Sequence, residues 1–236
     1  MSLVGPGVHQ IKLKASAAYL LETGPKLTLV DCGLPGDGSR IAAAIAAAGR
    51  RPTDVGQIVV SHAHRDHFGG LAEVKELTRA EVWMHPLDAA MVRSDQDRRP
   101  VRPAVPAPGL PGCLYPFLKG MFKLDGLAAV SVEHEVQDGD VLAGGIRVIH
   151  VPGASAGQIA LLWNRTLIAA DALSNSPGFG GHQFAYEDLE VAQTSMRRLA
   201  DLDFDNVVFG HGKPIIGNAA AAVRERFRRT MAGERA

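Results

Sequence analysis

Six consecutive positions in the first third of the chain concentrate side chains that bind metal ions. His62, His64, Asp66 and His67 supply three imidazoles and one carboxylate within this run. Such groups are costly to bury alone, because protonated imidazoles repel one another and neutral ones each need a partner. A divalent cation removes both difficulties, and zinc and its neighbours bind these donors. The run therefore predicts a metal site.

The run follows a short apolar segment, 58–60, that we interpret as a buried strand, and a helix is expected over about 69–79. The carboxyl ends of strands are where α/β proteins place their ligands. The metal-binding residues are thus expected on a loop that joins a strand to a helix.

Other segments predict the elements that must position this loop. Strands are expected over 8–13, 17–21, 27–30, 81–84, 141–151, 159–163, 167–170 and 206–209, and helices over 39–48, 188–200 and 218–229. Strands and helices alternate in two halves, about 1–90 and 130–236, which favours two sheets packed face to face inside outer helices. We expect one domain over 1–236, in which the proline-rich segment 94–126 forms a cover or lid.

Composition limits the functions of the chain. Its 236 residues carry 25 basic and 25 acidic side chains, so the net charge of zero argues against nucleic acid or a membrane surface as partner. No apolar run approaches the roughly 20 residues of a membrane helix. Cys32 and Cys113 form no Cys-x-x-Cys pair and the N-terminus lacks an export signal, so we expect a cytoplasmic protein.

Four segments, in order along the chain, resemble motifs of the metallo-β-lactamase superfamily. His-Ala-His-Arg-Asp-His at 62–67 resembles the His-x-His-x-Asp-His signature, and Leu-Val-Asp-Cys-Gly at 29–33 resembles an early strand that ends in Asp-x-Gly. The segment 167–171 resembles a strand whose terminal aspartate bridges two metals, and 209–214 resembles a Gly-His-Gly turn. The resemblance implies an α+β fold, a four-layered αββα sandwich of two mixed sheets flanked by helices.

The resemblance also implies roles for individual residues. Asp31 would support the metal loop without binding the ion, and Asp66 would act in catalysis by orienting or deprotonating water. The implied cofactor is one or two divalent ions, zinc foremost, with iron or manganese as alternatives. The implied metal ligands are His62, His64, Asp66, His67, Asp171 and His211.

One motif departs from the family pattern. Where the family usually has Pro-Gly-His-Thr, this chain has Pro-Gly-Ala-Ser at 152–155, and Gln158 replaces a second histidine often found four residues later. Alanine cannot bind a cation, so the first site would keep His62, His64 and a shared Asp171. The second site would keep Asp66, His67, His211 and the same Asp171. We predict an intact second site and a weakened or empty first site. Three further histidines are weak candidates to substitute for the missing ligand: His85, His134 and His150.

The predicted function is a metal-dependent hydrolase that directs a metal-activated water at a small-molecule ester, lactone, thioester or amide. Phe117, His182 and Tyr186 are candidates to bind the substrate. Two alternatives stay open. One is a catalytically impaired member of the fold that binds a metal or ligand, and the other is a nuclease-type phosphodiesterase, which zero net charge disfavours.

Overall fold

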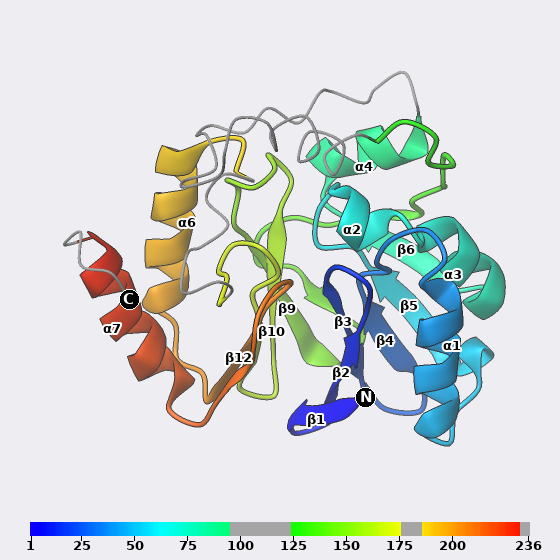
Figure 1. Ribbon diagram of the computed structural model, residues 1–236, viewed down its shortest axis with the longest axis horizontal. Coiled ribbons are helices and arrows are strands. Elements are labelled where there is room, and N and C mark those ends of the chain that lie inside the picture. The colour runs from blue at the N-terminus through cyan, green and yellow to red at the C-terminus, as the bar shows by residue number, and fades with distance from the viewer. Residues whose placement is uncertain (95–123, 176–185, 232–236) are drawn as a thin grey trace.

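Two mixed β-sheets face each other and helices cover their outer faces in the computed structural model (Figure 1). It describes residues 1–94, 124–175 and 186–231. The predicted α+β class and four-layered sandwich are confirmed. Most of the segment predicted as a lid, 95–123, lies outside the described residues. Within the described ranges, every helix is too short or too polar to cross a membrane.

The first sheet has seven strands that lie side by side in chain order. The pairs from β1 to β4 are antiparallel, and those from β4 to β7 are parallel. Parallel neighbours need long crossover connections, which helices supply here. The strands are β1 (Ser2–Gly5), β2 (Val8–Lys12), β3 (Ala17–Leu21), β4 (Leu27–Val30), β5 (Val55–Val59), β6 (Glu81–Met84) and β7 (His134–Glu135).

The second sheet has six strands, in the order β13-β12-β11-β10-β9-β8. Only β11 and β12 pair in parallel; the other pairs are antiparallel. The strands are β8 (Val141–Leu142), β9 (Ile146–His150), β10 (Ile159–Trp163), β11 (Thr166–Ile168), β12 (Asn206–Val208) and β13 (Ile215–Ile216).

Helices bury apolar side chains against the outer face of each sheet. In α1 (Gly38–Ala47), Ile41 and Ile45 are four residues apart and so lie on one face, which packs on the first sheet together with α3 (Leu71–Thr78). On the second sheet, α6 (Leu189–Ala200) begins at Asp188, whose carboxylate accepts a hydrogen bond from Val191 N–H at 3.0 Å. The remaining helices are α2 (Arg65–Phe68), α4 (Pro86–Arg93) and α7 (Ala219–Met231).

Side chains from both sheets form a shared core between them. It includes Tyr19 from β3 and Leu161 from β10, both buried. The Tyr19 hydroxyl donates to the carbonyl oxygen of Phe209 at 2.6 Å, and Ala17 N–H donates to the carbonyl oxygen of Gly210 at 2.9 Å. These bonds hold β3 beside the end of β12, where one of the predicted ligands follows.

The single strand predicted over 141–151 is wrong. A 3₁₀ turn, Ala143–Gly145, divides it into β8 and β9. Gly144 and Gly145 have φ of 78° and 81°, a left-handed conformation that ends regular strand pairing and that glycine adopts without steric cost. The sequence reasoning also missed β1, α2, α4, β7 and β13.

Candidate metal centre

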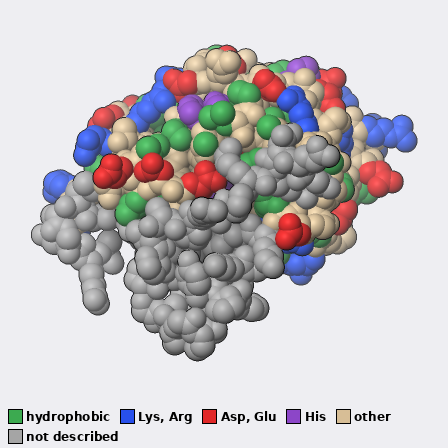
Figure 2. Space-filling view, turned by 90° about the horizontal axis from the view of Figure 1, so that it is seen from above, with side chains coloured by type: hydrophobic (Ala, Val, Ile, Leu, Met, Phe, Trp, Pro, Cys, Tyr) green, Lys and Arg blue, Asp and Glu red, His purple; other side chains and the backbone are tan. Residues whose placement is uncertain are grey.

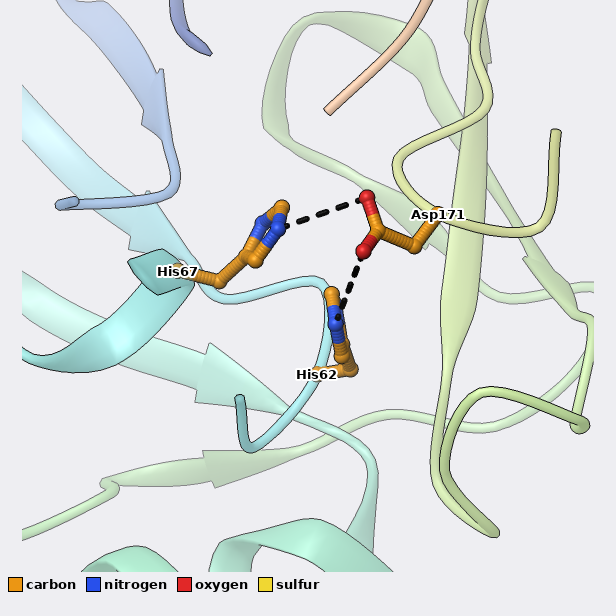
Figure 3. Close-up of side chains that lie close together, drawn as sticks. All are labelled: His62, His67 and Asp171. Atoms are coloured by element: carbon orange, nitrogen blue, oxygen red, sulfur yellow. Dashed lines mark ion pairs between the residues drawn. The ribbon is translucent and has the colours of Figure 1, made fainter. Parts of the chain in front are cut away.

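The predicted ligands meet at the rim of the two sheets, each directly after a strand. β5 leads into the loop and short helix that carry His62 to His67, β11 leads to Asp171, and β12 leads to His211. Ligands that lie far apart in the sequence therefore converge because both sheets end at one edge. Figure 3 shows His62 and His67 from the first half facing Asp171 from the second.

A first group of candidate ligands consists of His62, His67 and Asp171, all buried, with ligand atoms within 4.8 Å of one another. His67 Nε2 lies 3.3 Å from Asp171 Oδ1, and His62 Nε2 lies 3.7 Å from Asp171 Oδ2. His64 belongs to neither group, although its ring centroid is 4.4 Å from that of His62.

A second group consists of Asp66, His67 and His211. His211 Nε2 lies 3.1 Å from Asp66 Oδ2 and 3.5 Å from Asp171 Oδ2. His67 Nε2 lies 3.8 Å from Asp66 Oδ2. His67 belongs to both groups, and Asp171 contacts members of both. The four ligands predicted for the second site, Asp66, His67, Asp171 and His211, therefore lie close together.

The buried atoms of this centre fit a divalent cation. Among the described residues, His62 Nε2, His67 Nε2 and Asp171 Oδ1 are buried without a hydrogen bond. Leaving a buried polar atom without a hydrogen bond costs about 1–3 kcal/mol. The two imidazole nitrogens face one carboxylate here, and a cation between them would satisfy all three atoms. Imidazole nitrogen and carboxylate oxygen are the donors that zinc takes in catalytic sites.

Ionisation divides the histidines into two kinds. Burial, reinforced by His67 and His64, holds the pKa of His62 well below its ordinary value, and burial also lowers the pKa of His64. Burial would also lower the pKa values of His67 and His211, but the nearby carboxylates have the larger effect. They raise the pKa of His67 well above its ordinary value and that of His211 to about 10. A cation at this point would take the place of those protons.

The carboxylates of the centre remain ionised. Burial would raise the pKa of Asp66 and of Asp171, but the imidazoles of His67 and His211 outweigh it and lower both pKa values. Both side chains therefore offer anionic oxygens at neutral pH.

Asp31 supports the loop as the resemblance implies. Its backbone is left-handed, with φ of 64°, and its carboxylate turns back toward the loop after β5. Oδ1 accepts from Ser61 N–H at 2.8 Å, and Oδ2 accepts from Ser61 Oγ and lies 2.8 Å from His67 Nδ1. Holding Nδ1 in this way directs Nε2 of His67 toward the cation position.

Asp88, on α4, is a buried carboxylate that the sequence analysis missed. It accepts hydrogen bonds from Ala63 N–H at 2.8 Å, from Ser155 Oγ at 2.5 Å and from Gly157 N–H at 2.9 Å. It thus ties the metal loop to the turn that contains the departing motif. No spacing in the sequence marks it, because its partners are brought together only by the fold.

The departing motif lies against this centre without offering a metal ligand. Ala154 is buried in the apolar cluster that the second sheet shares with α6. Gln158 is fully buried. Its side-chain oxygen is oriented toward two backbone donors and accepts from the N–H of Asp171 at 3.1 Å and from the N–H of Ala172. The side chain in place of the second histidine therefore holds the backbone of a predicted ligand.

The three histidines considered as substitutes are engaged elsewhere. His85 stacks on His150 with ring centroids 4.1 Å apart, and His150 Nε2 lies 2.9 Å from the carbonyl oxygen of Ala156. His134 stacks on Trp83 and pairs with Glu81. None of the three belongs to a ligand group among the described residues.

Two of the three candidate substrate-binding residues, Phe117 and His182, lie outside the described residues. Tyr186 is fully buried, and its hydroxyl makes no hydrogen bond within the described part of the chain. Burial, with a smaller effect of the Asp171 charge, raises its pKa. Contact of Tyr186 with substrate stays a prediction.

Comparison with known proteins identifies the family of the chain. The family model of the metallo-β-lactamase superfamily matches residues 11–211. The chain therefore belongs to this superfamily of metallo-hydrolases, and the resemblance drawn from its motifs is confirmed.

Individual relatives are distant but cover most of the chain. The β-lactamase-like protein 2 homolog of Caenorhabditis elegans is 27% identical over 239 residues, covering 99% of this chain and 68% of the relative. Hydroxyacylglutathione hydrolase of Anaeromyxobacter dehalogenans is 30% identical over 190 residues, covering 80% and 58%. A mutant metallo-β-lactamase from Cronobacter sakazakii shares the fold, with a TM-score of 0.69 and 22% identity over 98% of this chain and 96% of that chain.

Proposed function

We propose that the protein hydrolyses a small-molecule ester, lactone, thioester or amide with a metal-activated water. The observation that carries the proposal is the convergence of His67, Asp171 and His211, from three separate segments, at one point. The relative named hydroxyacylglutathione hydrolase supports a small acylated substrate. On the face seen in Figure 2, acidic and basic side chains are interspersed, which fits a small molecule better than a nucleic acid.

A bound divalent cation supplies Lewis acidity and makes a water molecule nucleophilic near neutral pH. The residues of the chain position the water and orient the ligands. Asp66, with 18% of its side chain exposed, lies where it can hold the attacking water and accept its proton. His211, at 14% exposed, faces Asp66 from the opposite sheet. Asp31 keeps His67 oriented through Nδ1 while Nε2 faces the cation position.

We further propose that zinc is the resident ion and that the second site is its position. The second site offers Asp66, His67, His211 and Asp171, one more than the three protein ligands a catalytic zinc needs. The first site loses a ligand at Ala154.

We also propose a cytoplasmic location for the protein. Cys32 is a buried free thiol, and reduced cysteines are usual in the cytoplasm.

The test is hydrolysis of a panel of 4-nitrophenyl acetate, a γ-lactone and an acyl thioester by the zinc-loaded protein. Asp66→Asn and His211→Ala should each lower kcat/KM by at least about 100-fold, because each removes a group that holds the cation or the water. Asp203→Asn and His9→Ala change the same residue types away from the centre and should leave kcat/KM unchanged. Wild-type rates in the two site variants would contradict the proposal. Zinc binding without hydrolysis would identify the impaired member of the fold instead.

A further inference from the structure

A groove of about 610 Å³ runs from the metal centre along the junction of the two sheets. One wall is the β2–β3 hairpin, including its turn at 13–16, and the other is the 210–214 turn that follows β12. The groove includes His211, a member of the second ligand group, and Ser16, whose hydroxyl donates to the carbonyl oxygen of Asp66 at 2.5 Å. The groove and the metal centre therefore share a border.

Lysine side chains gather in this groove. The chain contains seven lysines, and five of them lie in the described residues. Three of these five line the groove: Lys12, Lys14 and Lys213. All three are exposed, and no carboxylate lines the groove with them within the described ranges.

The two other described lysines lie apart from each other and from the groove. Lys75 is paired with the Glu133 carboxylate at 2.6 Å, and Lys26 donates to the carbonyl oxygen of Thr53 at 2.9 Å. In the groove, Lys14 donates to the carbonyl oxygen of Pro35 at 3.1 Å, which fixes its position without neutralising its charge. A chain of zero net charge thus places three lysines beside its candidate metal centre, and no carboxylate of the described ranges forms an ion pair with them.

We infer that this groove binds an anionic group, a carboxylate or a phosphate, carried by the substrate at one end while its scissile bond lies at the metal centre. Lysine ammonium groups are compact point charges that hold either anion without the bidentate geometry that arginine imposes. A cleft lined by charges of one sign also raises the local concentration of an oppositely charged substrate. The inference rests on the proposed hydrolysis and narrows its substrates to acidic acyl compounds.

The first test compares 4-nitrophenyl acetate with the mono-4-nitrophenyl ester of succinic acid, which adds one carboxylate to the same leaving group. The zinc-loaded wild type should prefer the succinate ester in kcat/KM. A Lys12→Gln, Lys14→Gln, Lys213→Gln triple variant should lower that preference about tenfold, since each exposed charge pair contributes a few-fold. The loss should appear in KM and should shrink in wild type as salt rises.

A matched triple variant controls for the change of net charge. Lys26→Gln, Arg51→Gln and Arg79→Gln remove three exposed cations remote from the groove and should keep the wild-type preference. An equal loss in both triple variants would overturn the inference, because it would trace the effect to net charge alone.

Binding measured by calorimetry separates this inference from the proposed hydrolysis. Succinate should bind the zinc-loaded wild type about tenfold tighter than the groove variant, whereas acetate, which is too short to reach from the metal into the groove, should bind both equally. Phosphoglycolate titrated in parallel distinguishes phosphate from carboxylate as the preferred anion. Loss of succinate affinity in the groove variant supports the inference even if no ester is hydrolysed. Equal succinate affinity in both proteins would overturn it even if both esters are hydrolysed.

Discussion

Ala154 and Gln158 stand where the superfamily pattern usually carries two histidines. Neither offers a metal ligand, and Gln158 instead fixes the N–H groups of Asp171 and Ala172. Asp171 therefore keeps its position although the neighbouring histidine motif is absent. The second ligand group lies beside this carboxylate, and under the proposed function the first site, with His62, His64 and Asp171, is short of one imidazole.

We expect one zinc ion per chain by elemental analysis of protein purified without added metal. Ala154→His should raise the content toward two ions in excess zinc, because an imidazole joins His62 and Asp171. Ala160→His, at another buried alanine of the same cluster, is the matched control and should leave the content at one. Two ions at full occupancy in the wild type would contradict this prediction.

Sequence reasoning could single out the candidate ligands of the first half for a definite reason, whereas Asp171 and His211 were assigned through the family resemblance. His62, His64, Asp66 and His67 are adjacent in the chain, and so dense a group of donors is costly to bury unless a cation binds them. Asp88 gave no signal, because its three partners come from two distant loops and each bond forms only in the folded chain. Contacts of that kind follow from tertiary packing, which composition and periodicity do not encode.

At the scale of elements, α4 connects two loops that belong to different sheets. Asp88 projects from this helix and accepts from Ala63 in the metal loop and from Ser155 and Gly157 in the turn after β9. Helix, metal loop and turn are thus held in one arrangement by a single carboxylate.

Asp88→Ala should therefore lower the free energy of unfolding by about 3–5 kcal/mol, because three buried donors lose their acceptor. Zinc affinity should fall as well, since Ala63 lies between His62 and His64. Ser155→Ala removes the hydroxyl that donates to Asp88 and leaves no donor unpaired, so the free energy of unfolding should fall by only about 1 kcal/mol. Urea unfolding and zinc titration measure both effects. A variant as stable as wild type would show that α4 does not hold the loops.

Strand and helix positions were predictable where apolar runs are bounded by turn residues, as in β3 and β4. The division of 141–151 was missed although the sequence carries a signal for it, because adjacent glycines such as Gly144 and Gly145 mark turns and both have positive φ here. The two-residue strands β7 and β13 are stabilised by pairing with their neighbours rather than by their own sequence.

At the scale of the whole molecule, the ionisation of the centre sets how stability depends on pH. His67 and His211 have pKa values above the ordinary 6.5, so their contribution is complete below that pH and is lost as the pH rises, for His211 through about 10. His62 and His64 have lowered pKa values, so the unfolded chain takes up protons below pH 6.5 that the folded chain does not.

The protein stripped of metal by a chelator should therefore be most stable near pH 6.5 and lose stability on both sides. The lowered pKa values of Asp66 and Asp171 add a further loss as the pH falls below 3.8. Under the proposed zinc binding, the ion replaces the protons on His67 and His211, so the loaded protein should lack the alkaline decline. Urea midpoints from pH 5 to 10, with zinc and with chelator, measure this. An alkaline decline of equal size in both forms would contradict it.

The bond between Tyr19 and Phe209 also has a consequence for biosynthesis. The two residues are 190 positions apart, and at about 5–20 residues per second a ribosome needs roughly 10 to 40 s to make that stretch. For most of this interval the nascent chain carries the metal loop at 62–67 without β12, the strand that leads to His211. Asp31, Ser61 and His67 all belong to the first half, so the bonds that orient His67 need no residue of the second sheet.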